Sequence, residues 1–138
     1  MRSSIGITLA LAALVVPLTS GAQERGPAKP PPPLLREIVQ GMPKGEKQEL
    51  RVLVATLKPG ETTPFHTHRF PVTVYVLEGT FTLEMEGRAP VTAKAGQAIV
   101  EPPQVKMTGH NRSSTEAMRV VIFYVSDPDT PFLDLAHH

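Results

Sequence analysis

The stretch GETTPFHTHRFPVTVYVLEG, residues 60–79, places two histidines one residue apart and just ahead of a β-branched run. Residues i and i+2 of a strand point to the same face, so His66 and His68 can aim both imidazoles at one ion. The run VTVYV at 72–76 predicts a strand that ends in a turn at Gly79. The stretch therefore predicts a histidine pair carried on one strand face.

The remaining apolar runs are also short, β-branched and bounded by Gly or Pro, which is typical of many short strands. Further strands are expected within 49–60, 80–87, 96–103 and 118–127. The sequence after the N-terminal segment contains no long amphipathic helical pattern. An all-β fold follows, but strand patterns alone do not choose between a jelly roll, a sandwich and other barrels.

The spacing around the histidines narrows that choice. Gly60, five residues, His66-Thr67-His68, ten residues and Gly79 form one motif. A second motif, GQAIVEPPQVKMTGHN at 96–111, has Gly96, then Pro102 after five residues, then Asn111. Together the two motifs resemble those of the cupin family, in particular small single-domain cupins of the conserved-barrel type.

The resemblance covers about residues 34–126 and implies a cupin jelly-roll β-barrel. It also implies a metal site, because cupins usually bind a divalent metal through three histidines and one glutamate. His66 and His68 match the first two ligand positions. The glutamate position falls on Val72, the last histidine position on Met107, and a motif glycine on Gln104.

These departures shift the expected metal. Two imidazoles and the thioether of Met107 form a set that suits a soft ion, copper(I) above all, and that holds iron, manganese or nickel less well. On this hypothesis His66→Ala abolishes binding, and Met107→His shifts preference towards zinc, iron or nickel. Two alternatives stay open: Met107 only packs in the barrel, or His110 supplies a third nitrogen.

Three classes of function fit these observations. The first is an exported metal-binding cupin that uses His66, His68 and Met107. The second is a metal-dependent cupin enzyme that oxidises or isomerises a small molecule, and the third is a metal-free ligand-binding cupin. The sequence identifies no catalytic residue, because it shows no nucleophile with a base placed beside it.

The N-terminal 22 residues predict export. They carry one early positive charge, an apolar run and small residues before Ala22, which is the pattern of a signal peptide cleaved after Ala22. Residues 23–33 are rich in proline and predict an extended linker. The chain has no cysteine, so any metal must be held by His, Met or oxygen ligands. A periplasmic or secreted protein without a membrane anchor is expected.

Charge and chain ends set the remaining expectations. With 14 Lys and Arg against 13 Asp and Glu, and no basic stripe, nucleic acid is not expected as a partner. A small molecule is expected as a ligand. The chain is also expected to form a homodimer, which pairs through the open edge of a strand at 36–40.

The C-terminal tail, residues 127–138, is expected to be loose, and His137 and His138 have no expected role.

Overall fold

The computed structural model describes residues 26–138. The predicted signal peptide and the first residues of the linker lie outside the described residues. Residues 26–31 have no regular secondary structure, and Pro32–His138 form one compact unit. Among the described residues, no helix is long and apolar enough to cross a membrane.

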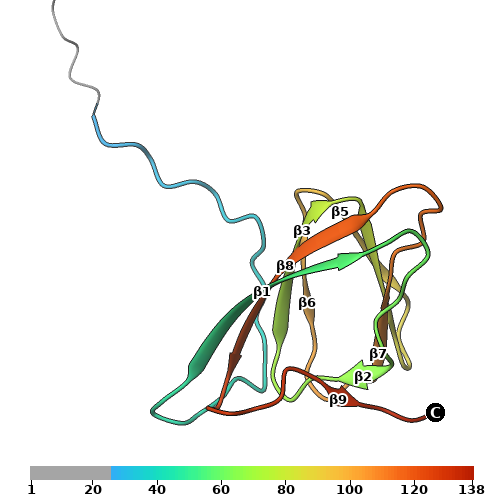
Figure 1. Cartoon of the computed structure of the whole chain (residues 1–138). Coiled ribbons are helices and arrows are strands. Elements are labelled where there is room, and N and C mark those ends of the chain that lie inside the picture. The colour runs from blue at the N-terminus through green and yellow to red at the C-terminus, as the bar shows by residue number, and fades with distance from the viewer. Residues whose placement is uncertain (1–25) are drawn as a thin grey trace, which may run out of the picture. The chain divides into compact units, whose positions relative to one another are not determined.

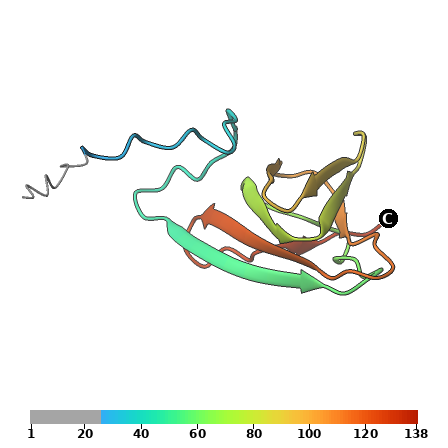
Figure 2. The ribbon, with the colours of Figure 1, turned by 90° about the horizontal axis from the view of Figure 1, so that it is seen from above.

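Residues 26–138 contain strands and no helix, which confirms the predicted all-β jelly roll. The strands are β1 Glu49–Leu57, β2 His66–Thr67, β3 Val72–Glu78, β4 Thr80–Met85, β5 Val91–Lys94, β6 Ala98–Glu101, β7 Met107–His110, β8 Met118–Ser126 and β9 Asp134–Leu135. They form two antiparallel sheets, ordered β1-β8-β3-β6 and β5-β4-β7-β2-β9. Figures 1 and 2 show these sheets as the two walls of the barrel.

Strand β8 organises the first sheet, because it pairs with β1 along its whole length and with β3 on its other side. Alternate β8 residues point inwards, from Met118 to Tyr124, as a strand with one face on the core requires. The inner faces of both sheets supply the core. Its buried residues are Val72, Val74, Val76, Phe81, Leu83, Ala93, Met107, Met118, Val120, Ile122 and Tyr124.

The strands expected from the sequence are present, and each of them ends just before a Gly or Pro. Three short strands, β5, β7 and β9, were not expected, and the strand expected to carry both histidines is the two-residue β2, which ends before His68. The expectation of a loose tail is wrong: β9 pairs with β2, so His66 stands opposite Leu135 and Thr67 opposite Asp134. The tail is held because backbone groups of the short β2 would otherwise lack a partner on that side.

The segment expected to pair two subunits is not a strand. Residues 36–40 have no regular secondary structure, although they are β-branched in part, and the Ile38 side chain is 98% exposed. The free edges of the first sheet belong to β1 and β6 instead. The homodimer stays a prediction, without the strand that was expected to form it.

Gln104 stands where the cupin motif has a glycine, and its backbone keeps the conformation of that glycine. Its φ angle is 61°, in the left-handed region that a motif glycine adopts without steric cost. The backbone N–H of Gln104 donates a hydrogen bond to the carbonyl oxygen of His68 at 2.8 Å. The turn therefore keeps the glycine conformation, and its hydrogen bond holds the backbone at the second histidine.

We predict that Gln104→Gly stabilises the protein. The left-handed conformation costs a non-glycine residue about 1–2 kcal/mol, and part of the relief is lost to glycine's greater freedom in the unfolded chain. The expected gain is about 0.5–1 kcal/mol in the free energy of unfolding, measured by urea denaturation. Gln40→Gly, at an exposed position without positive φ, is the control and should give no gain. Equal effects of the two changes would contradict the argument.

Candidate metal centre

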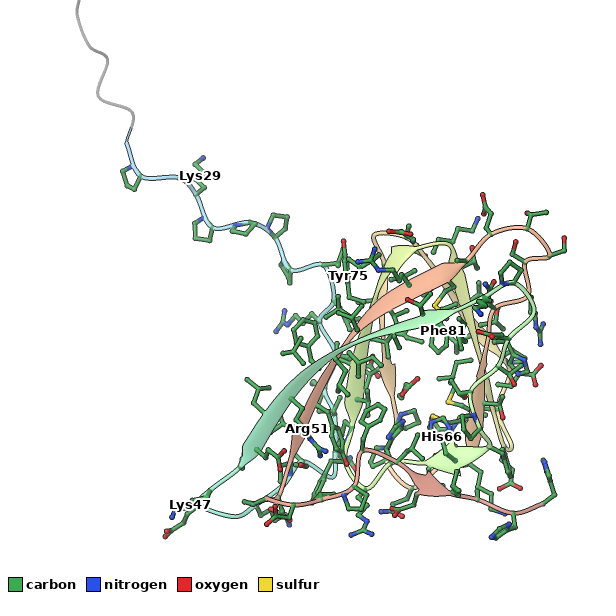
Figure 3. The ribbon with its side chains drawn as sticks, viewed as in Figure 1. Lys29, Lys47, Arg51, His66, Tyr75 and Phe81 are labelled. Carbon is green, nitrogen blue, oxygen red and sulfur yellow. The ribbon has the colours of Figure 1, made fainter. Side chains whose placement is uncertain are left out.

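The two histidines sit where the second sheet narrows to a two-residue strand. His66 lies in β2, between Met107 of β7 on one side and Leu135 of β9 on the other. His68 follows two residues later, so both imidazoles point into the barrel as the i, i+2 spacing predicts. Their exposed fractions are only 4% and 1%. Figure 3 shows His66 beside the ribbon of β2, within the barrel.

Two backbone carbonyls fix the protonation of these rings. Nδ1 of His66 lies 2.6 Å from the Pro64 carbonyl oxygen, and Nδ1 of His68 lies 2.6 Å from that of Phe132. A carbonyl oxygen only accepts hydrogen bonds, so each Nδ1 must carry the hydrogen and donate it. In the neutral ring Nε2 is then left with a free lone pair, which is the form that binds metals.

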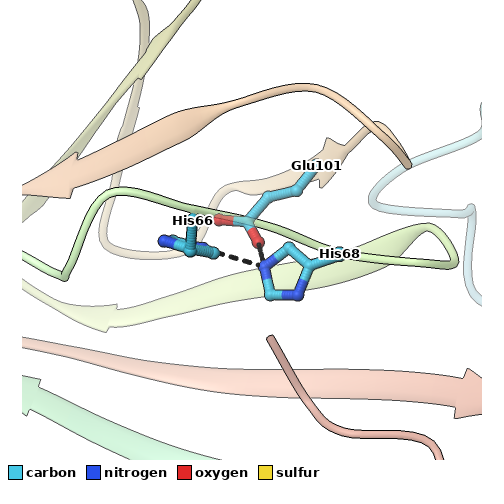
Figure 4. A group of neighbouring side chains, drawn as sticks. All are labelled: His66, His68 and Glu101. Carbon is cyan, nitrogen blue, oxygen red and sulfur yellow. Dashed lines mark hydrogen bonds and ion pairs between the residues drawn. The ribbon is translucent and has the colours of Figure 1, made fainter. Parts of the chain in front are cut away.

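Both Nε2 atoms and a carboxylate converge on one point. The two Nε2 atoms are 3.1 Å apart, and Nε2 of His68 is 3.1 Å from Oε2 of Glu101. Figure 4 shows dashed lines from both His66 and Glu101 to the ring of His68. One ligand atom from each residue lies within 4.8 Å of the other two, and all three residues are buried. Among the described residues, His66, His68 and Glu101 are the one group of His, Cys, Asp or Glu side chains whose ligand atoms lie close enough together to hold a metal.

This convergence requires a cation. Three atoms that carry lone pairs, one of them from a carboxylate, face one another in a buried place where water cannot separate them. Either a proton or a metal ion must sit between them. Burial lowers the pKa of His66, and the nearby His68 lowers it too; together they outweigh the Pro64 carbonyl and the Glu101 carboxylate, which raise it. The proton is therefore disfavoured on His66, and the donor set fits a metal ion.

Glu101 is the candidate ligand that sequence reasoning missed. The glutamate position of the family motif is Val72, which is fully buried, and the site was expected to lack a carboxylate. That expectation is wrong, because Glu101 at the end of β6 stands directly opposite Val72 of β3. Residues opposite each other in an antiparallel pair share a face. The carboxylate thus reaches the same region of the barrel from the neighbouring strand.

The other two candidate ligands occupy different surroundings. Met107 stands opposite His66 on β7 and is fully buried within the hydrophobic core. His110, three residues later on β7, is only half-buried, and its Nε2 lies 3.1 Å from Oε2 of Glu84. The alternation of β7 directs Met107 inwards and His110 outwards. His110 is therefore not brought to the histidine pair, and ligation by Met107 stays a prediction.

A small cavity of about 110 Å³ adjoins the three converging side chains. Apart from His66, His68 and Glu101 its walls are almost entirely apolar. They are formed by Ala55, Leu57, Thr63, Pro64, Val74, Phe81, Met118, Val120, Ile122, Phe132 and Leu133. The one side-chain hydroxyl in the cavity wall belongs to Thr63, and it already forms hydrogen bonds with backbone groups of Pro64 and Gly109. The cavity thus offers one polar end and an apolar body.

Comparison with known proteins agrees with this architecture. The Cupin domain family profile matches residues 53–124. A double-stranded β-helix protein from Klebsiella pneumoniae, described as uncharacterized, has a TM-score of 0.56 at 21% identity, with 76% of this chain and 87% of that chain covered. A cupin-like protein from Thermotoga maritima gives 0.53 at 22%, covering 63% and 64%. No curated protein matches the sequence significantly.

Two of the similar structures carry a named activity. The DMSP lyase DddQ from Ruegeria pomeroyi has a TM-score of 0.54 at 19% identity, covering 72% of this chain and 59% of that chain. Identities this low show a shared fold and no more. The chain spans 44% and 41% of two further similar structures, one of DMSP lyases and one of YhaK from Escherichia coli.

We predict that His66 and His68 both carry their ring hydrogen on Nδ1. The Pro64 and Phe132 carbonyls accept those hydrogens, so this tautomer should persist across neutral pH. Long-range ¹H–¹⁵N correlation spectra of the imidazoles distinguish the two tautomers directly. The half-exposed His110 has no such carbonyl partner and serves as the internal reference. Hydrogen on Nε2 of both His66 and His68 would contradict the assignment.

Proposed function

Because the chain belongs to the cupin family, we propose that it binds a divalent first-row metal ion through His66, His68 and Glu101. The observation that supports this most strongly is the meeting of three buried ligand atoms, with Nδ1 of each imidazole already directed at a backbone carbonyl oxygen. A metal ion would compensate the carboxylate charge and use both free lone pairs.

Two of the observed separations between ligand atoms fit such an ion. Metal bonds to imidazole nitrogen and carboxylate oxygen are about 2.0–2.2 Å long, so two ligands at right angles lie about 3 Å apart. The separations of 3.1 Å between the Nε2 atoms and 3.1 Å from His68 to Glu101 agree with that value. Metal binding by these three residues therefore needs little movement of the barrel wall.

The donor set also bears on which metal is bound. Two imidazoles and one carboxylate are typical of non-haem iron(II) sites, and the same set holds catalytic zinc. The carboxylate is a hard, charged ligand, which favours iron, manganese, nickel or zinc over copper(I). Copper(I) with Met107 as the third ligand is the alternative, supported by the burial of Met107 opposite His66.

A metal-dependent enzyme is the second candidate. Three protein ligands leave positions on an ion for a small molecule, and the cavity lies against those same three residues. When bound, the metal would supply Lewis-acid or redox chemistry. The chain's own part would be to orient the imidazoles, to hold the carboxylate and to exclude water with apolar walls. A lyase activity occurs on this fold in DddQ.

Cavity size limits any substrate. A volume of about 110 Å³ admits only a few non-hydrogen atoms, and the apolar walls cannot pair a second polar group. A compact molecule with one oxygen-bearing end is the kind of ligand that fits. We also propose that the protein acts after export, which rests on the pattern of residues 1–22 alone.

We predict that Glu101→Val removes metal binding and that Val72→Glu restores it in the same chain. Truncating the carboxylate should weaken affinity by more than the 10–100-fold typical of changes outside the ligand set. The double variant returns a carboxylate from the facing position on β3. Isothermal titration of metal-free protein with iron(II), zinc and manganese(II) measures each affinity.

The control is Glu84→Gln, which alters a half-exposed carboxylate on β4 that faces His110 instead. Its metal affinity should equal that of the unchanged protein. Unaltered affinity in Glu101→Val would remove Glu101 from the site. Absence of any binding by the unchanged protein would remove the metal proposal and favour a metal-free ligand-binding protein.

We predict that Met107→Leu leaves the affinity for divalent ions unchanged, since the change keeps volume and apolar character while removing the sulfur. The unfolding free energy should fall by less than about 1.5 kcal/mol. Titrations with zinc and with copper(I) compare the two variants. Loss of copper(I) affinity greater than about tenfold in Met107→Leu would favour the thioether site instead.

A further inference from the structure

The C-terminal strap, which we define as Thr130–Ala136, forms one wall of the candidate metal centre. Phe132 and Leu133 line the cavity beside the two histidines. The Phe132 ring lies 4.9 Å from the ring of His68, between centroids, and its carbonyl oxygen accepts the hydrogen of His68 Nδ1. The strap therefore contacts the second histidine through both its backbone and its side chain.

Three sets of bonds attach the strap to the barrel. At its start, Nη2 of Arg51 donates to the Thr130 carbonyl oxygen at 2.7 Å. At its end, the Ala136 N–H donates to the Phe65 carbonyl oxygen at 2.9 Å. Between them, β9 pairs with β2, which carries His66. The strap is thus bonded to β1 at its start and, at its end, to β2 and to the residue before it.

A paired set of charges holds the middle of the strap. Nε and Nη2 of Arg69 donate to the two carboxylate oxygens of Asp134 at 2.9 and 3.0 Å. Such two-point pairs fix geometry better than single contacts. The hydrogen bonds from Arg69 hold the pKa of Asp134 below its ordinary value. Arg69 directly follows His68 in sequence, so this latch ties the strap next to the ligand.

We infer that the strap is the positioning element of the metal centre and that Asp134 is its latch residue. This inference rests on the proposed metal binding by His66, His68 and Glu101. The strap fixes the Nδ1 hydrogen and the ring direction of His68, and it closes the cavity against water. Ion pairs at the surface are weak and reversible, so the Arg69–Asp134 latch sets how readily the strap lifts and the metal leaves.

The first test removes the strap's contact with His68. Deleting residues 132–138 takes away the Phe132 carbonyl and ring but keeps the Arg51 bond to Thr130. Outer partners of a metal-binding imidazole contribute about 10–100-fold to affinity, so cobalt(II) should bind about 10–100-fold more weakly. Deleting only His137 and His138 is the matched control and should leave cobalt(II) affinity unchanged.

The second test keeps the full chain and loosens the latch. Asp134→Asn should speed release of cobalt(II) to a chelator by about two- to fivefold, and Asp134→Glu should restore slow release. Glu78→Gln is the matched control, because it breaks a comparable exposed ion pair with Arg119 at 2.9 Å, on the other sheet. The thermal midpoint of the metal-free protein is measured for each variant.

The outcomes separate the two proposals. If the unchanged chain binds no cobalt(II), zinc or iron(II), the metal proposal falls and the strap inference falls with it. If it binds and Asp134→Asn releases cobalt(II) no faster than Glu78→Gln, the strap inference alone is overturned. A lower thermal midpoint with unchanged release would assign the strap to stability only. If the shortened chain does not fold, the latch variants decide.

Discussion

The candidate site depends on two hydrogen bonds from imidazole to backbone. Pro64 and Phe132 present carbonyl oxygens to Nδ1 of His66 and His68, and in the neutral rings each bond leaves the opposite nitrogen without a hydrogen. Without these bonds the rings could turn or exchange tautomers, and Nε2 of one could simply donate to the other. With them, two lone pairs and a carboxylate are held together in a buried space.

The barrel supplies these carbonyls from distant parts of the chain. Pro64 lies two residues before His66, just ahead of β2, whereas Phe132 lies 64 residues beyond His68 in the C-terminal strap. Glu101 comes from the other sheet, across the barrel interior. The apolar core around them keeps water out, which strengthens every electrostatic interaction at the site. The same burial makes an uncompensated carboxylate costly, which supports the proposal of a bound metal ion.

Much of this arrangement could be predicted from sequence, and the exceptions have physical causes. The β-branched runs and the histidine spacing predict the all-β fold and the shared face of His66 and His68. The role of Glu101 depends on its register opposite Val72, which a single strand pattern does not contain. An acidic residue that ends the apolar run AIVE, just before two prolines, was the available signal.

The C-terminal segment was mispredicted for a related reason. Residues 127–138 contain Pro, Asp and a short apolar run, which resembles a loose tail. Their order comes from long-range partners: β2 on one side, and Arg51 and Arg69 through their guanidinium groups. Gln104 shows the opposite case, in which the backbone keeps a glycine conformation although the residue has changed.

The measurement that tests the central claim most directly is the X-ray absorption spectrum of the protein loaded with one equivalent of zinc. The account predicts a first coordination shell of nitrogen and oxygen atoms only, at about 2.0–2.2 Å, with the outer-shell scattering of two imidazoles. A sulfur atom in that shell would contradict the assignment of Glu101 in place of Met107. A shell without imidazole scattering would contradict the histidine site altogether.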